Sequence, residues 1–146
     1  MKPAMIAALM GASLSLPIAA HAGDAAAGES EYRKCRACHM IQDASGNDIV
    51  KGGVTGPNLW NIMGQPIASV EGYRYGEGIL AAAAANPDLV WTEEEMAAYV
   101  TDPQAWVREK SGNASARSKM TFKLNRGQED IAAYLTSVSP DAPAAE

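Results

Sequence analysis

Apolar residues recur at helical spacing in several short segments of the chain. The first segment follows Asp24, whose side chain can cap a helix. The apolar face of this segment is formed by Ala25, Gly28, Tyr32 and Cys35, with charged residues opposite. We therefore expect the first helix to run from residue 25 to Cys35.

Two further helices are indicated in the middle of the chain. One starts near Gly78 and contains the alanine run of residues 81–85, and it is ended by Asn86-Pro87 because the residue before a proline disfavours helix. The other follows Thr92, which with Glu95 has the spacing of a capping box. The apolar face expected for this second helix is formed by Met96, Tyr99 and Val100.

Asp102-Pro103 then predicts the start of a fourth helix, which carries Trp106 and Val107 inward and ends near Gly112. The last helix is expected to begin at about Asn125 or Arg126. Its apolar stripe consists of Ile131, Tyr134, Leu135 and Val138.

Residues 42–58 are rich in glycine and have no sustained period, so they are interpreted as loop. No strand pattern and no repeat is recognised. The pattern therefore predicts one small all-α domain with long loops over residues 23–138. Proline, alanine and acidic residues from Ser139 onward predict a flexible tail over residues 139–146.

Residues 1–22 have the order of a secretory signal peptide. Lys2 supplies the positive start, an apolar stretch of small residues follows, and Ala20-His21-Ala22 forms an A-x-A site. Cleavage is expected after Ala22. This predicts export to an oxidising compartment, most simply a bacterial periplasm.

Composition narrows the class of protein. A formal net charge of −5 argues against a nucleic-acid binder, and two cysteines are too few for a disulfide scaffold. The chain has only one phenylalanine and few large aliphatic side chains, so its own core is thin. Small domains of this kind usually need a cofactor, a metal or a partner to complete the core.

Cys35-Arg36-Ala37-Cys38-His39 is a C-x-x-C-H motif, which is the signature for covalent attachment of haem. Two thiols three positions apart can form thioethers with the two vinyl groups at one porphyrin edge. The adjacent His39 then supplies the proximal iron ligand. The motif predicts a haem c held through Cys35 and Cys38.

Three other interpretations of the motif have less support. A thioredoxin-like pair would need a βαβ pattern around the cysteines. A zinc site would need a fourth ligand. Once His21 has been removed, the chain contains no Cys or His besides Cys35, Cys38 and His39. A disulfide between Cys35 and Cys38 would close a very small, strained loop.

The sixth iron ligand cannot be a second histidine after export. The remaining choices are methionine, lysine, a weaker donor or no ligand. The methionines of the exported chain are Met40, Met63, Met96 and Met120. Met120 lies in an expected loop beside Ser118-Lys119, where packing explains a methionine least well, so spacing favours Met120 over Met63.

These features together resemble the class I c-type cytochromes, in particular the soluble mono-haem cytochromes c of mitochondria and of the periplasm of purple bacteria. The resemblance extends from Gly28 to Leu135. The motifs that carry it are Cys35-Arg36-Ala37-Cys38-His39, Gly56-Pro57-Asn58-Leu59-Trp60, Gly72-Tyr73-Arg74-Tyr75, Trp91-Thr92, Tyr99, Lys119-Met120-Thr121-Phe122 and Glu129-Asp130-Ile131-Ala132-Ala133-Tyr134-Leu135.

The resemblance implies a cytochrome c fold, with crossing N- and C-terminal helices and loops wrapped around one covalent haem. It implies iron ligation by His39 and Met120, with the Pro57 carbonyl orienting the His39 ring. Tyr75 and Trp91 would bind a haem propionate, and Tyr99 would reach the Met120 sulfur. Trp60 is interpreted as ordinary core.

The function implied is one-electron carriage by a monomer, not catalysis, because both axial positions of the iron are filled. A cytochrome bc complex would be the donor, and a terminal oxidase or photosynthetic reaction centre the acceptor. Seven cationic residues could surround the exposed haem edge and steer docking: Arg33, Lys34, Arg36, Arg117, Lys119, Lys123 and Arg126. The alternative is a labile Met120 in a gas sensor or weak peroxidase, for which the length of the preceding loop is the only indication.

Overall fold

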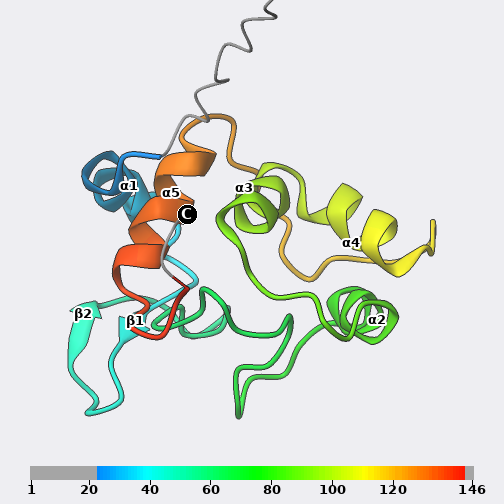
Figure 1. Ribbon diagram of the computed structural model, residues 1–146, viewed down its shortest axis with the longest axis horizontal. Helices are drawn as coiled ribbons and strands as arrows, with labels where there is room; N and C mark the ends of the chain where they lie inside the picture. The colour runs from blue at the N-terminus through cyan, green and yellow to red at the C-terminus, as the bar shows by residue number, and fades with distance from the viewer. Residues whose placement is uncertain (1–22, 144–146) are drawn as a thin grey trace, which may run out of the picture.

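The computed structural model describes residues 23–143, and the expected signal peptide of residues 1–22 lies outside them. The molecule consists of short helices with one small hairpin at the edge (Figure 1). Residues from several of these helices and loops line one cavity. The elements are α1 (Ala25–Glu31), the 3₁₀ turn η1 (Tyr32–Lys34), β1 (Ile41–Gln42), β2 (Asp48–Val50), α2 (Glu77–Ala85), α3 (Glu93–Thr101), α4 (Pro103–Ser111) and α5 (Gln128–Ser137). Within the described residues, no helix is long and apolar enough to cross a membrane.

The first and last helices pack against each other on one side of the molecule (Figure 1). Their contact depends on Gly28, because a Cβ atom there would lie 1.9 Å from the carbonyl oxygen of Asp130. Beside this point the rings of Tyr32 and Tyr134 pack with their centroids 5.5 Å apart. The expected crossing of the N- and C-terminal helices is confirmed.

The helix starts expected from capping residues are confirmed at three positions. The carboxylate of Asp24 accepts the N–H of Ala26 at 2.9 Å at the start of α1. The Thr92 hydroxyl accepts the N–H of Glu95 at 3.1 Å before α3, and Asp102 accepts the N–H of Ala105 at 3.0 Å before α4. Local side-chain chemistry therefore sets where these helices begin.

Two helix boundaries differ from the sequence expectation. The first helix does not continue as α-helix to Cys35, since it tightens into η1 after Glu31. The last helix begins at Gln128 and not at Asn125 or Arg126, because Gly127 has a left-handed backbone with φ of 76°. That conformation interrupts a right-handed helix and is easily adopted by glycine.

The expectation that residues 42–58 contain no strand was wrong. β1 and β2 form a short antiparallel pair in which Ile41 lies opposite Val50. The turn between them is stabilised by Asp43, whose carboxylate accepts the N–H groups of Ser45 and Asn47. Strands of two and three residues are too short to produce a recognisable alternation of apolar and polar residues.

Part of the tail for which flexibility is expected, from Ser139 to Ala142, packs on the domain, and residues 144–146 of that tail lie outside the described residues. Ser139 is buried, its hydroxyl donates to the carbonyl of Leu135 at 2.7 Å, and it accepts the N–H of Met63 at 3.2 Å. Asn61 and Asp141 exchange two hydrogen bonds. Met63 lies 76 residues from Ser139 in the chain, and Asn61 lies 80 residues from Asp141, so local composition did not reveal these contacts.

Ala68 has a backbone φ of 60°, which is the left-handed region that costs an L-residue about 1–2 kcal/mol. We expect Ala68→Gly to raise the free energy of unfolding by about 0.5–1 kcal/mol, since relief of strain exceeds the entropy that glycine adds to the unfolded chain. Denaturant titration measures the change. The control Ala44→Gly, at an exposed turn residue without positive φ, should change stability in the opposite direction. Equal changes in both variants would contradict the strain argument.

Candidate haem site

A cavity of about 390 Å³ lies between the helices and is lined mainly by apolar side chains. This volume is within the usual range for a bound organic cofactor. All eight residues expected to bind haem line this one cavity, although they come from six separate parts of the chain. They are Cys35, Cys38, His39, Pro57, Tyr75, Trp91, Tyr99 and Met120.

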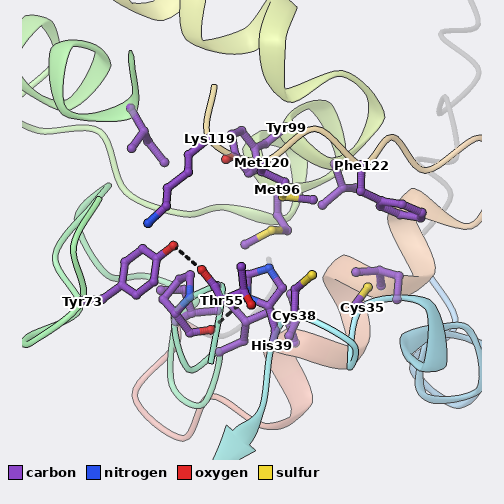
Figure 2. Close-up of a pocket in the computed structure, with 18 of the residues that line it drawn as sticks. Cys35, Cys38, His39, Thr55, Tyr73, Met96, Tyr99, Lys119, Met120 and Phe122 are labelled. Carbon is purple, nitrogen blue, oxygen red and sulfur yellow. Dashed lines mark hydrogen bonds between the residues drawn. The ribbon is translucent and has the colours of Figure 1, made fainter. Parts of the chain in front are cut away.

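The two cysteines lie on the turn that follows η1. The N–H groups of Cys38 and His39 both donate to the carbonyl of Cys35 at 3.0 Å, so the turn holds the three residues of the motif together. Both thiols are free and line the cavity, Cys35 half-buried and Cys38 exposed (Figure 2). Burial raises the pKa of the Cys35 thiol to about 11.

The His39 ring is oriented by the loop that carries the Gly56-Pro57 sequence. Nδ1 of His39 lies 2.8 Å from the Pro57 carbonyl oxygen, which can only accept, so Nδ1 carries the proton. Burial lowers the pKa of His39 below its ordinary value, although the bond to Pro57 opposes this shift. A neutral ring with its proton on Nδ1 leaves the Nε2 lone pair available for a metal.

Gly56 allows the loop to approach the His39 ring. A Cβ atom at this position would lie 2.1 Å from Cε1 and 2.5 Å from Nδ1 of His39. No side chain fits in that space. The glycine before Pro57 is therefore required for the ring to be held at the Pro57 carbonyl.

Of the four candidate methionines, Met96 and Met120 line the cavity and Met40 and Met63 do not. Met63 is only 2% exposed and belongs to the hydrophobic core. Met96 is also a core residue, on the inner face of α3. Met120 lies in the loop between α4 and α5, across the cavity from His39 (Figure 2).

Three aromatic rings pack together at one wall of the cavity. Trp91 and Tyr99 line it, with ring centroids 5.2 Å apart, and both contact Trp106 of α4. Trp106 stacks on Trp91 at 5.5 Å, and its Nε1–H donates to the Glu95 carboxylate at 2.8 Å. The sequence placed Trp106 inward but gave no indication that it supports a cavity residue.

Two phenol groups at the cavity, those of Tyr75 and Tyr99, are neutral hydrogen-bond donors. Burial raises the pKa values of Tyr75 and Tyr99 above the ordinary range. The Tyr75 hydroxyl accepts the N–H of Val70 at 3.2 Å, so its own proton remains available to an acceptor such as a carboxylate in the cavity.

Tyr73 and Lys119 close one edge of the cavity, and the sequence did not indicate that these two side chains contact each other. The Tyr73 hydroxyl donates to the carbonyl of Thr55 at 2.7 Å (Figure 2). Lys119, next to Met120, donates to the carbonyl of Arg74 at 2.9 Å and lies over the Tyr73 ring. Only the repeated aromatic residues of Gly72-Tyr73-Arg74-Tyr75 could have indicated this contact.

The expected cationic patch is reduced by ion pairs. Lys34 and Lys119 line the cavity, but Lys34 pairs with Glu31. Lys123 pairs with Asp102 at 2.5 Å. Two of the seven candidate cations are therefore neutralised by carboxylates on the same surface.

The cavity fits a haem better than a bare metal ion. No group of three His, Cys, Asp or Glu side chains that could hold a metal occurs within residues 23–143. What the cavity provides is two thiols beside a neutral imidazole, the thioethers of Met96 and Met120, and apolar walls with a few phenol and indole groups. These are the donors that a covalently attached haem requires.

Comparison with known proteins agrees with this donor set. The chain is 55% identical over 144 residues to cytochrome c-550 of Paracoccus versutus, covering 99% of this chain and 94% of that protein. It is 45% identical over 138 residues to cytochrome c2 of Rhodobacter capsulatus, covering 94% and 98%. The chain belongs to the class I c-type cytochromes.

Solved structures show the same fold. The crystal structure of cytochrome c2 from Paracoccus denitrificans superposes with a TM-score of 0.81 at 55% identity, covering 82% of this chain and 99% of that one. A search of protein-family models finds no match. Members of this class of cytochromes carry a covalently attached haem c with its iron and transfer electrons, so the chain is an electron carrier with that cofactor.

Proposed function

We propose that this cytochrome is an exported one-electron carrier whose haem iron is ligated by His39 and Met120. The observation that supports the ligand pair most directly is their placement on facing sides of one cavity (Figure 2). The neutral His39 ring, with Nδ1 bonded to Pro57, offers Nε2 to the iron. The cysteine thiols of Cys35 and Cys38 would form the two thioethers.

The bound haem supplies an iron that alternates between two oxidation states, and a methionine thioether favours the reduced state and raises the potential. His39 and Met120 would both bind the iron, and the cavity around them is lined mainly by apolar residues. With both ligands bound, no coordination position would be left for a substrate. This arrangement supports electron transfer and not catalysis.

The packing of Gly23 supports cleavage after Ala22. A Cβ at Gly23 would lie 2.0 Å from the carbonyl oxygen of Glu129, and the Asp24 N–H donates to Asp130 at 2.8 Å. The folded domain thus includes the residue that cleavage would make the N-terminus. Mass spectrometry of the periplasmic protein should give a chain that starts at Gly23.

We further propose a cytochrome bc complex as donor and a terminal oxidase or photosynthetic reaction centre as acceptor. The support is similarity to relatives named cytochrome c2 and cytochrome c-550. Membranes that contain one acceptor at a time would test this, with the rate of oxidation of the reduced protein as the readout. Failure of both acceptors to oxidise it would contradict the assignment.

The visible spectrum tests the ligand pair. If Met120 is bound, the ferric protein shows a far-red sulfur-to-iron band, and carbon monoxide does not shift the spectrum of the reduced protein. A missing far-red band together with a carbon monoxide shift would overturn the carrier function. It would favour a protein that binds gases or reacts with peroxide.

Gly56→Ala is expected to weaken proximal ligation. The added Cβ would overlap the His39 ring and push Nδ1 away from the Pro57 carbonyl. Loss of such an outer-shell partner typically costs about 10–100-fold in metal affinity or activity. The measurement is the yield of covalently attached haem and its reduction potential. Val54→Ala, at an exposed residue two positions earlier, is the control and should match the wild type. Normal values for both variants would contradict the role assigned to Gly56.

A further inference from the structure

The Gln104 side chain binds the loop that carries Met120 to the first turn of α4. Gln104, the second residue of α4, donates from Nε2 to the carbonyl of Ala116 at 2.6 Å. Its Oε1 accepts the N–H of Ser118 at 3.2 Å. One side-chain amide group therefore forms hydrogen bonds with two backbone groups of the loop, one as donor and one as acceptor.

A third hydrogen bond continues from this bridge to Met120. The Ser118 hydroxyl donates to the carbonyl oxygen of Met120 at 2.8 Å. Gln104, Ser118 and Met120 thus form an uninterrupted series of hydrogen bonds. It ends at the backbone of the proposed ligand.

The two sides of this loop rest on rigid elements. α4 is anchored by the buried residues Pro103, Trp106 and Val107. On the other side, a Cβ at Gly78 of α2 would lie 2.3 Å from the carbonyl oxygen of Arg117. The loop is held between α2 and α4, and Gln104 connects its segment of residues 116–118 to α4.

We propose that Gln104 is a positioning residue that keeps Met120 at the haem iron. The inference rests on the proposed function, since it takes Met120 as the distal ligand. Without the Gln104 amide, the buried Ala116 loses the partner of its carbonyl and Ser118 loses that of its N–H. Unpaired groups of this kind favour loop conformations that reach water, and those conformations move Met120 away from the iron.

Gln104→Leu in the haem-loaded protein tests the proposal, with imidazole as the competing ligand of the ferric iron. Loss of two net hydrogen bonds predicts about tenfold tighter imidazole binding. The pH at which the far-red band is half lost should also fall by about one unit. In addition, amide hydrogen exchange at Ser118 should become faster.

Gln128→Leu is the matched control. Gln128 is also half-buried and donates from Nε2 to a single carbonyl, that of Leu124, at 2.7 Å. It begins α5 and makes no bond to the residues before Met120. Imidazole binding and the far-red band of this variant should match the wild type even if its overall stability falls.

The outcomes separate the two hypotheses. The first hypothesis is ligation of the iron by Met120, and the second is positioning of Met120 by Gln104. A wild-type protein without a far-red band would contradict both. A normal band in the wild type with equal imidazole binding in all three proteins would overturn only the role of Gln104. An equal increase in imidazole binding in both variants would also overturn it, because general destabilisation would then explain the change.

Discussion

Replacing Met120 with leucine is expected to lower the reduction potential of the haem by roughly a few hundred millivolts, a large part of the about 0.8 V over which axial ligands set haem potentials. Leucine has a similar volume but no sulfur, so it removes the soft donor that favours ferrous iron. The sixth position then becomes available to carbon monoxide. Redox titration and the spectrum of the reduced protein with carbon monoxide measure both effects.

Met96→Leu is the control for this prediction, because Met96 is the other methionine that lines the cavity. It belongs to the core face of α3, where leucine fills nearly the same space. This variant should keep the far-red band and most of the potential. If Met96→Leu lost the band and Met120→Leu kept it, Met96 would be the ligand.

Gly28→Ala is expected to destabilise the folded protein by about 3 kcal/mol, the upper part of the usual range for overpacking. In an isolated helix the same change would be stabilising by about 1 kcal/mol. Here the new Cβ would overlap the Asp130 carbonyl of α5, which is rigid backbone, so α1 and α5 must separate. The melting temperature should fall by roughly 10–20 °C.

Ser30→Ala tests whether helix propensity alone explains the result. Ser30 is exposed on the same helix, and its hydroxyl makes only a local bond to the carbonyl of Ala26. A change within about 0.5 kcal/mol is expected for this variant. Similar melting temperatures for Gly28→Ala and the wild type would show that α1 and α5 can adjust, and the close-approach argument would fail.

The helix pattern of this protein was largely predictable because its signals are local. Each capping side chain accepts a backbone N–H from within three residues, so both partners lie in one short segment of sequence. This holds for Asp24, Thr92 and Asp102. The boundary of α5 was less predictable. It depends on the left-handed backbone conformation of Gly127. A glycine can adopt this conformation but does not have to, so its presence in the sequence does not predict the boundary.

The candidate site was predictable to a different degree for each residue. The five consecutive residues of C-x-x-C-H contain all the groups that attach the haem and bind its iron on one side. This part of the site could therefore be predicted without tertiary information. Residue type and spacing alone left Met63 and Met120 as competing ligands. The structure separates them because Met63 is in the core and Met120 lines the cavity.

The sequence by itself determined the covalent chemistry of the cofactor, the mainly helical character and most helix starts, since these depend on residues within one or two turns of each other. Only the tertiary structure decided that Ser139 and Asp141 pack against the segment of residues 61–63, that Trp106 supports Trp91, and that Gln104 holds the loop before Met120. Those contacts join residues between 12 and 80 positions apart. No periodicity or local motif encodes them, because they exist only once the helices have packed around the cavity.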